Sequence, residues 1–280
     1  MFQQIMQNAS ERAALLNGDN YYIGDNGFKY CKKCHTPMQI DVSPYCHFMG
    51  IVDCLCECGV RARDARENSS EKERRQRITD RILNAAFQDK AMKNNTFAND
   101  KYHLECAEML KTYCNKFSSM REKGEGLLLF GNYGTGKTYY ASCVINKLAE
   151  QQYESLFTNF SQLAAKSDYG FDLAEYLNRY SLVVFDDLGV ERSSEYMQQI
   201  VYNAIDARYR ARLPMIITTN VTMAELKHPA NAMEQRIYGR ILERCFPINF
   251  NMEALRMEEI KYNFTAIKTE FDEDLGNERN

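Results

Sequence analysis

An eight-residue segment that begins at Gly131 carries the strongest chemical signal in this sequence. Gly131-Asn132-Tyr133-Gly134-Thr135-Gly136-Lys137-Thr138 matches the pattern G-x-x-x-x-G-K-T, and the apolar run 127–130 directly precedes it. Glycines after a buried strand let the backbone turn back, so that its N–H groups and the start of the next helix point at phosphate oxygens. Lys137 would then reach the β- and γ-phosphates of a nucleotide, and Thr138 would place its hydroxyl on Mg²⁺. The segment predicts a phosphate-binding loop.

Two carboxylates follow a second apolar run. Residues 181–185 have the composition of a buried parallel strand, and Asp186 and Asp187 come directly after it. Ligands of open α/β sheets bind at the carboxyl ends of the strands, where Asp186 would hold Mg²⁺, directly or through water, and Asp187 would polarise the attacking water. A core strand ending in a solvated acidic turn gives the same pattern. A position roughly 50 residues after a phosphate-binding loop favours the catalytic interpretation.

A third polar strand end occurs at Asn220. The segment 214–220 is a predicted strand that changes from apolar to polar residues at its end. Beside the two acids, Asn220 can orient water against the γ-phosphate. Turn chemistry alone makes asparagine equally expected at the end of a strand, so both interpretations stay open.

Six of the ten cysteines lie between residues 31 and 58. Two cysteine groups separated by about 20 residues can supply four thiolates to a tetrahedral Zn²⁺, and a region this poor in large apolar residues needs such a link to fold. Cys31 and Cys34 are the better supported pair of ligands. The sequence does not choose among the remaining candidates, which are Cys54, Cys56 and Cys58 and, as less favoured ligands, Cys46, His35 and His47. Free cysteines in a loop are the alternative, which the clustering disfavours.

The composition is that of an ordinary globular protein. Of the 280 residues, 45% are hydrophobic and 26% charged, and the net charge of −3 means that any contact with nucleic acid must come from a local basic patch. No apolar run approaches the roughly 18 residues that span a membrane, and residues 1–4 lack the order of a signal peptide. We therefore expect a cytoplasmic protein that has no membrane contact and keeps its cysteines reduced or metal-bound.

Alternating helices and strands must position these residues. A basic, exposed helix is predicted over 61–81, and its apolar stripe should dock on the chain's own core or on a partner. After a break at 94–100, further helices are predicted at 102–120, 141–148, 195–210 and 233–244. Strands are predicted at 127–130, 153–158, 181–185, 214–220 and 247–250.

This order predicts an α/β fold with a central parallel sheet flanked by helices, preceded by a small zinc-binding N-terminal domain. The predicted division is a zinc-binding domain at 1–66, a basic helical linker at 67–95, a nucleotide-binding domain at 96–268 and a disordered acidic tail at 269–280.

Six segments together carry a family resemblance: GNYGTGKT, LVVFDDLG, MIITTN, RIYGRILER, PINF and NMEALR. Their order resembles the AAA+ ATPase domain of the DnaC/DnaI-type replicative helicase loaders, a group that is also similar to the transposition ATPase IstB. The resemblance covers residues 92–262. The cysteine-rich N-terminus followed by a basic helix is similar to phage and Gram-positive loaders. The resemblance implies an AAA+ P-loop NTPase that uses ATP and Mg²⁺, beside the Zn²⁺ expected from the cysteines.

The resemblance also implies roles for single residues. The glycine-rich segment matches Walker A, Asp186 and Asp187 match Walker B, and Asn220 matches sensor 1. Arg240 matches the arginine finger, which acts on a neighbouring subunit's nucleotide, and Arg256 matches the sensor 2 arginine. Many AAA+ proteins have glutamate in place of Asp187, whose side chain is one methylene shorter. This departure predicts slow hydrolysis.

The predicted position of Arg240 in the fold agrees with the role of an arginine finger. An arginine on a helix at the domain edge is better placed for a neighbour's γ-phosphate than for its own, although a surface ion pair is the simpler alternative. Nucleotide sites shared between subunits build rings or open spirals. We therefore expect a homo-oligomer when ATP is bound.

The resemblance implies an ATP-dependent loader that delivers a hexameric, DnaB-like replicative helicase onto single-stranded DNA at the initiation of DNA replication, with the zinc domain holding the helicase. One alternative is an IstB-like ATPase that assists a transposase. A longer cysteine-free N-terminal region would favour it, so residues 31–58 favour the loader. The other alternative is a zinc-bearing adaptor whose nucleotide site acts as a switch with little turnover. A DnaA-like initiator is disfavoured because no basic helix-turn-helix domain follows residue 262.

Overall fold

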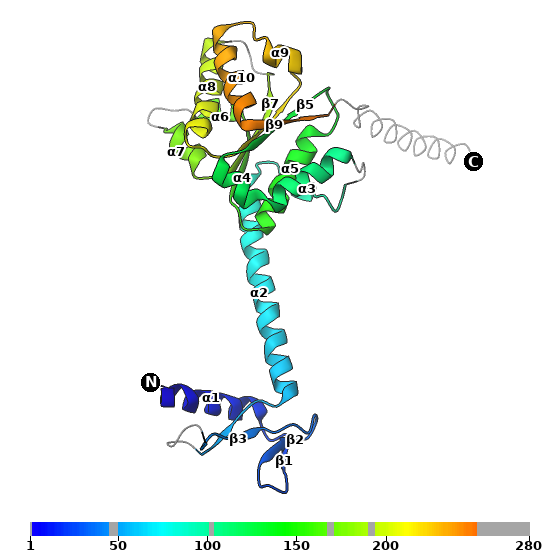
Figure 1. The fold of residues 1–280 in the computed structure, drawn as a ribbon, viewed down its shortest axis with the longest axis vertical. Coiled ribbons are helices and arrows are strands. Elements are labelled where there is room, and N and C mark those ends of the chain that lie inside the picture. Colours follow the sequence, from blue (N-terminus) through cyan, green and yellow to red (C-terminus); the bar gives the residue numbers. More distant parts are fainter. Residues whose placement is uncertain (1, 45–49, 101–103, 167–170, 190–193, 251–280) are drawn as a thin grey trace, which may run out of the picture. The chain divides into compact units, whose positions relative to one another are not determined.

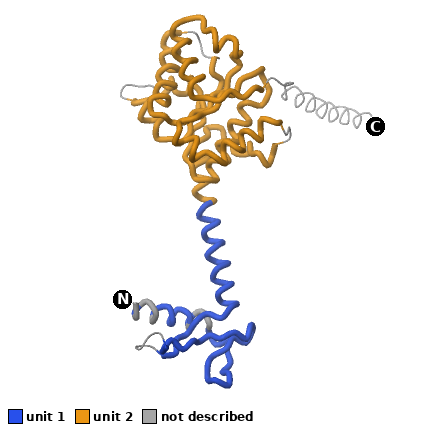
Figure 2. Tube along the Cα trace, in the orientation of Figure 1, with its two compact units in different colours: residues 1–75 blue, residues 76–280 orange. Residues whose placement is uncertain are grey.

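The computed structural model describes residues 2–44, 50–100, 104–166, 171–189 and 194–250. The chain divides into two compact units, residues 1–75 and residues 76–280 (Figure 2). One long helix, α2 (Glu57–Ala86), contributes to both units. Within the described residues, every helix is too short or too polar to span a lipid bilayer. The predicted four-part division stays a prediction, and its acidic tail at 269–280 lies outside the described residues.

The first unit is built from short elements. Besides the start of α2 they are α1 (Phe2–Asn17), β1 (Tyr21–Ile23), β2 (Lys29–Cys31), β3 (Gln39–Asp41) and β4 (Ile51–Asp53). The strands form two antiparallel pairs, β1 with β2 and β3 with β4. A small cluster of buried side chains, Cys31, Met38 and Cys56, forms around these elements. So small a cluster offsets little of the conformational entropy lost on folding.

The two ends of α2 differ in character. In the first unit its side chains are mostly exposed and charged, and they pair within the helix, as Arg74 and Arg75 do with Glu71. In the second unit Ile82 and Ala86 are buried. The predicted apolar stripe of this helix therefore packs on the chain's own core.

The described part of the second unit contains a five-stranded parallel sheet with the order β6-β7-β8-β5-β9 (Figure 1). Its strands are β5 (Gly126–Phe130), β6 (Ser155–Asn159), β7 (Leu182–Leu188), β8 (Met215–Thr219) and β9 (Cys245–Asn249). All five carboxyl ends lie at one edge of the sheet, because the strands are parallel. This confirms the predicted α/β fold with a central parallel sheet.

Helices cover both faces of this sheet. They are α3 (Glu105–Asn115), α4 (Phe117–Lys123), α5 (Lys137–Glu150), α6 (Phe160–Lys166), α7 (Leu173–Asn178), α8 (Glu195–Arg210), α9 (Met223–Lys227) and α10 (Ala232–Arg244), with a 3₁₀ turn at Lys90–Asn94. Alternate residues of each strand face opposite sides, so Leu127 and Leu129 join the core under α3 and α5, and Leu128 joins the core under α6, α8 and α10. A sheet buried on both faces is a rigid base for the residues at its edge.

One predicted helix is wrong. The single helix expected over 102–120 is two helices, because Lys116 leaves the helical conformation at φ −102° and ψ 13°. The break turns the chain so that Tyr113 and Phe117 both enter the same core, where their rings meet edge to face at 5.8 Å. Residues 102 and 103 of the prediction lie outside the described residues.

A buried arginine fastens the amino ends of two strands. The side chain of Arg208 on α8 is fully buried and donates hydrogen bonds to the carbonyl oxygens of Leu177, Tyr180, Ser181 and Pro214, at 2.6 to 3.3 Å. These carbonyls precede β7 and β8. Burial lowers the pKa of Arg208 to about 9, so the guanidinium still carries its charge at neutral pH.

Replacing Arg208 with methionine should therefore destabilise the second unit. The change leaves four carbonyls without their donor, and we expect a loss of about 3 kcal/mol, or roughly 6–12 °C in Tm. Thermal unfolding of the full chain measures this loss. Arg210→Met is the matched control, because Arg210 is exposed on the same helix and its ion pair with Asp206 should contribute only about 0–1 kcal/mol. Equal Tm shifts for the two variants would contradict this account of Arg208.

Candidate active site and metal centre

The glycine-rich segment forms a tight loop between β5 and α5. Gly134 and Gly136 have φ values of 75° and 90°, in the left-handed region that favours glycine. Helix α5 begins at Lys137, so the unpaired N–H groups of its first turn lie at the loop. Asn132 and Tyr133 are exposed, whereas Thr135 is buried and donates to the Asn132 carbonyl (2.9 Å). The geometry is that of a backbone cradle for an anion.

The lysine of this segment turns back into the loop. Its Nζ donates hydrogen bonds to the carbonyl oxygens of Gly131 (2.9 Å) and Asn132 (2.6 Å), and the side chain is buried. Burial lowers the pKa of Lys137, whereas the charges of Asp187 and Asp186 act in the opposite direction. The ammonium therefore lies inside the loop, where the oxygens of a bound phosphate could replace the two carbonyl acceptors.

The next residue contacts the first Walker B acid. The hydroxyl of Thr138 donates to the carboxylate of Asp186, at 3.0 Å to Oδ1 and 3.3 Å to Oδ2. Burial raises the pKa of Asp186, which makes a cationic partner favourable. Hydroxyl and carboxylate oxygens are the ligands that Mg²⁺ prefers, so Thr138 and Asp186 fit the predicted metal position.

The second acid, Asp187, is fixed through a hydrogen bond of its backbone N–H. Asp187 is exposed at φ 59°, and its N–H donates to the Oγ1 of Thr218 (2.8 Å). The same hydroxyl donates to Asp186 Oδ1 (2.6 Å). Thr218 was not among the predicted site residues. Aligning the apolar runs of β7 and β8 in parallel would have placed it opposite Asp186.

Asn220 follows the last residue of β8. Among the described residues, neither the oxygen nor the nitrogen of its amide has a hydrogen-bond partner, although both atoms are buried. A buried amide is usually paired. Asn220 therefore has a donor and an acceptor available at the edge of the sheet where Asp186 and Asp187 lie.

Arg240 is engaged within its own chain. One guanidinium nitrogen lies 2.8 Å from Asp206 Oδ1 and 3.1 Å from the Tyr202 hydroxyl, and the guanidinium carbon lies 4.8 Å from the centre of the Tyr202 ring. The side chain is 21% exposed. An ion pair, the simpler alternative to an arginine finger, is thus present between Arg240 and Asp206. The predicted sensor 2 residue, Arg256, lies outside the described residues.

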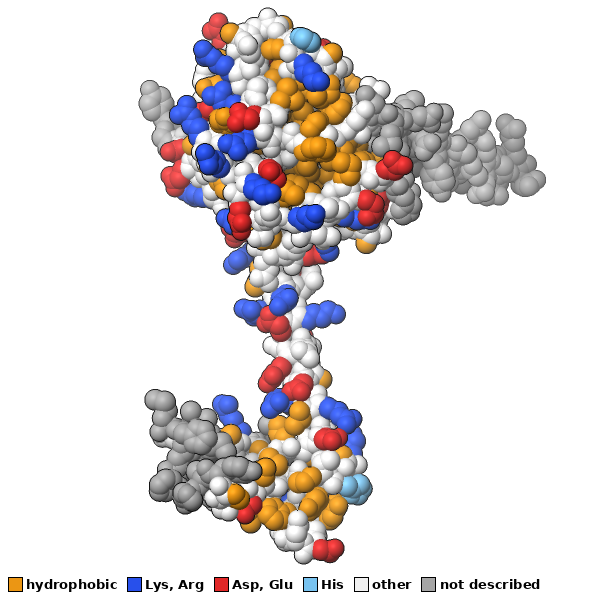
Figure 3. Space-filling view, viewed as in Figure 1, with side chains coloured by type: hydrophobic (Ala, Val, Ile, Leu, Met, Phe, Trp, Pro, Cys, Tyr) orange, Lys and Arg blue, Asp and Glu red, His pale blue; other side chains and the backbone are white. Residues whose placement is uncertain are grey.

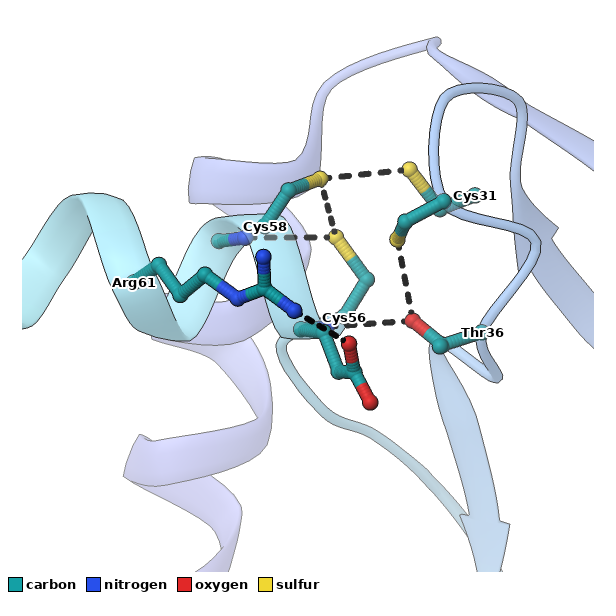
Figure 4. A network of polar contacts seen from close by, with 8 residues as sticks. Cys31, Thr36, Cys56, Cys58 and Arg61 are labelled. Carbon is teal, nitrogen blue, oxygen red and sulfur yellow. Dashed lines mark hydrogen bonds and ion pairs between the residues drawn. The ribbon is translucent and has the colours of Figure 1, made fainter.

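Four cysteines of the first unit converge on one point (Figure 4). The sulfurs of Cys31, Cys34, Cys56 and Cys58 all lie within 4.8 Å of one another. Cys31 is the last residue of β2 and Cys34 lies in the turn after it, whereas Cys56 directly precedes α2 and Cys58 lies in its first turn. The Cys58 sulfur lies 3.2 Å from that of Cys56 and 3.5 Å from that of Cys31. Four sulfurs at this separation fit the tetrahedral coordination of Zn²⁺.

Hydrogen bonds to the sulfurs support this interpretation. The N–H groups of Lys33 and Gly59 donate to the sulfurs of Cys31 and Cys56, both at 3.4 Å. The hydroxyl of Thr36 lies 3.0 Å from the Cys34 sulfur and makes the largest contribution among several hydrogen bonds that together lower the pKa of Cys34 to about 5. Donors of this kind stabilise the thiolate form, which is the form that binds metal.

The remaining candidates differ in position. Cys54 lies outside the cluster, and its sulfur is 3.9 Å from the Pro37 carbonyl, so the four sulfurs that converge belong to the other four of the five predicted candidates. Cys54, Cys56 and Cys58 are spaced two residues apart, and this spacing alone does not decide which of them face Cys31 and Cys34. The ring of His35 lies instead against Tyr22. Cys46 and His47 lie outside the described residues.

The sequence matches known proteins over the second unit. The family described as "IstB-like ATP binding protein" matches residues 61–262. The replicative helicase loader DnaI of Bacillus subtilis is 28% identical over 150 residues, which are 48% of this chain and 48% of that protein. A putative insertion sequence ATP-binding protein of Sinorhizobium fredii is 28% identical over 142 residues, 48% of this chain and 47% of that protein. The chain thus spans about half the length of these two relatives.

A third relative and a solved structure extend the likeness. The replicative helicase loader DnaC of Escherichia coli is 23% identical over 203 residues, which cover 68% of this chain and 81% of that protein. The crystal structure of DnaI covers 59% of this chain and 95% of its own, with a TM-score of 0.50 and 23% identity, a likeness of fold. These matches confirm the resemblance to helicase loaders and IstB-like ATPases.

The four-cysteine cluster leads to a test of metal binding. We expect about one zinc per chain in purified protein, and loss of that zinc in Cys56→Ser, because three thiolates and a hydroxyl make a much weaker site. Metal analysis by mass spectrometry measures the content. Cys54→Ser is the matched control, two residues away and outside the cluster, and should keep its zinc.

Neither cysteine substitution should change ATP binding by the second unit. ATP binding by Cys56→Ser should equal that of the unchanged chain, which separates loss of metal from general misfolding. Purified, folded protein without metal would contradict the zinc assignment, and loss of zinc from Cys54→Ser would show that the wrong four ligands were chosen.

Proposed function

The chain belongs to the family of IstB-like ATP-binding proteins, and we propose that it is an ATPase that loads a hexameric replicative helicase onto single-stranded DNA. The family match supports ATP binding and hydrolysis. Two relatives, DnaI and DnaC, are named replicative helicase loaders and support the loading role.

The observation that carries the ATPase assignment is the hydrogen bond between Thr138 and Asp186. It joins the phosphate-binding loop to the acidic strand, so that a hydroxyl and a carboxylate can hold Mg²⁺ beside the phosphates. A bound Mg²⁺ neutralises charge on the β- and γ-phosphate oxygens. Lys137, already inside the loop, adds a second positive charge there.

Hydrolysis needs a water molecule placed against the γ-phosphate. In our proposal the exposed carboxylate of Asp187 accepts a hydrogen bond from that water and raises its nucleophilicity. The unpaired amide of Asn220 provides a second hydrogen bond that fixes the direction of attack. The short side chain of Asp187 keeps turnover slow.

Arg240 completes the site of a neighbouring subunit in this proposal. Its guanidinium exchanges Asp206 for the neighbour's γ-phosphate, and the two acceptors are alternatives for the same charge. Subunits joined in this head-to-tail way form a ring or an open spiral.

The first unit favours helicase loading over assistance to a transposase. The metal-binding cluster at 31–58 gives the chain a second folded unit, which we propose as the contact with the helicase. The similarity to the insertion sequence ATP-binding protein of Sinorhizobium fredii supports assistance to a transposase as the alternative function.

Contact with DNA requires local positive charge, because the net charge is −3. Lysine and arginine side chains gather on the side of the second unit where α7 and α8 lie (Figures 1 and 3). Arg179 at the end of α7 and Arg210 on α8 are exposed. We propose this side as the contact with the phosphates of single-stranded DNA.

Two substitutions separate nucleotide binding from turnover. Lys137→Ala should weaken ATP binding, because it removes the charge at the β- and γ-phosphates. Asp187→Asn should bind ATP nearly as well as the unchanged chain and lose turnover. Equilibrium binding and phosphate release measure the two effects. Equal loss of binding in both variants would remove Asp187 from the hydrolytic step.

The same two variants test the loading role with the full chain. The unchanged protein should increase the amount of hexameric helicase that unwinds a single-stranded circle carrying an annealed strand, and Lys137→Ala should not. If the protein hydrolyses ATP but has no effect on any replicative helicase of its host, and instead stimulates a transposase, the alternative function replaces the loader.

Mixing two inactive variants tests the shared site. Arg240→Ala and Lys137→Ala should each lose turnover. Removal of an arginine finger lowers turnover on the order of 10³-fold, whereas a surface ion pair contributes only about 0–1 kcal/mol to stability. Mixed oligomers contain interfaces that pair an intact Lys137 with a neighbour's intact Arg240, so ATPase activity should return on mixing.

Arg236→Ala is the control for this mixture, because Arg236 is exposed one turn earlier on α10. Alone it should keep most of the turnover. Failure to recover activity on mixing, together with normal and concentration-independent turnover of Arg240→Ala, would show that Arg240 serves only its pair with Asp206.

A further inference from the structure

The strand pairing beside the active site is irregular at one point. β7 and β8 pair in regular parallel register up to Phe185 and Ile217, and the next pair is Leu188 with Thr219. Two residues of β7, Asp186 and Asp187, therefore stand against one residue of β8, Thr218. A bulge of this kind bends the strand and redirects its side chains, and such bulges are frequent beside active sites.

One hydroxyl group holds this bulge. The Oγ1 of Thr218 accepts the N–H of Asp187 at 2.8 Å and donates to Asp186 Oδ1 at 2.6 Å. A hydroxyl has a single proton, so donation to Asp186 and acceptance from Asp187 fix its rotation. Thr218 is fully buried, and no solvent competes for these bonds.

The bulge also places Asp187 in a strained backbone conformation. A φ of 59° lies in the left-handed region, which aspartate adopts only at some cost in free energy. The hydrogen bond from its N–H to Thr218 offsets that cost. Without it the backbone would be free to return to the extended conformation, and the carboxylate of Asp187 would move.

We propose that Thr218 is a positioning residue that orients both acids of the site through one hydroxyl group. It aims the carboxylate of Asp186, and through the backbone of Asp187 it aims the second carboxylate. It touches neither nucleotide nor water in this role. The inference rests on the proposed ATPase function and deepens it by adding the residue that couples the metal position to the position of the attacking water.

Three substitutions test this role. Thr218→Val has nearly the same shape and removes only the hydroxyl, and we expect a loss of about 10- to 100-fold in turnover and a similar rise in the Mg²⁺ concentration that gives half-maximal activity. Affinity for ATP in EDTA should be unchanged. Thr218→Ser keeps the hydroxyl and should restore most of both quantities.

Thr219→Val is the matched control. Thr219 is the next residue of β8 and equally buried, but its hydroxyl donates to the Leu188 carbonyl (2.7 Å) and not to an acid. We expect it to lower the thermal midpoint as much as Thr218→Val does, while its Mg²⁺ requirement stays normal. Equal losses of turnover in the two valine variants, or no rescue by serine, would overturn the proposal.

A second measurement keeps the test independent of hydrolysis. Binding of a fluorescent ATP analogue with and without Mg²⁺ gives the gain in affinity due to the metal. If the unchanged protein shows this gain but no turnover, the proposed ATPase function fails. Loss of the gain in Thr218→Val alone still supports the role of Thr218, and its retention overturns that role.

Discussion

The hydrogen bond between the Thr138 hydroxyl and the Asp186 carboxylate is the contact on which the candidate site of the second unit depends. It joins the first turn of α5 to the end of β7, and the two meet only because β5, β8 and β7 are neighbours in one parallel sheet. The sheet keeps this order because helices bury both of its faces. At the opposite edge, Arg208 ties the chain segments that precede β7 and β8. The fold thus fixes the amino ends of the two strands through Arg208 and places the site residues at their carboxyl ends.

Sequence alone predicted what local patterns determine. The glycines and Lys137, the apolar runs and the acids behind them have fixed spacings, so the sheet, the phosphate-binding loop and the acidic strand followed from them. What it missed depends on contacts between distant segments. The helix break at Lys116 comes from packing Phe117 into a core whose shape no local pattern describes. Thr218 resembles any strand residue until the register of β7 against β8 is known. The choice among Cys54, Cys56 and Cys58, which the sequence left open, likewise depends on where α2 begins.

The first unit depends on a different kind of interaction. Its strands are three residues long, and its cluster of buried residues includes two of the four converging cysteines. Side chains that belong both to the core and to a metal site make folding and metal binding one process, since the sulfurs meet only in the folded unit. The second unit has its own large core and carries no such requirement. We therefore expect metal binding by the first unit and nucleotide binding by the second to be separate properties.

If Arg240 is the proposed arginine finger, its position would link assembly to hydrolysis. Within one chain its charge is neutralised by Asp206 and covered by Tyr202, so a guanidinium that acts on a neighbour must first leave both. A γ-phosphate carries more negative charge than a carboxylate and is the stronger acceptor. The exchange is favourable only when a neighbour with bound nucleotide lies within reach. In the proposed assembly an isolated chain would keep the arginine paired with Asp206, and an assembled chain would release it. The ion pair between Arg240 and Asp206 is therefore the contact that would make hydrolysis depend on assembly.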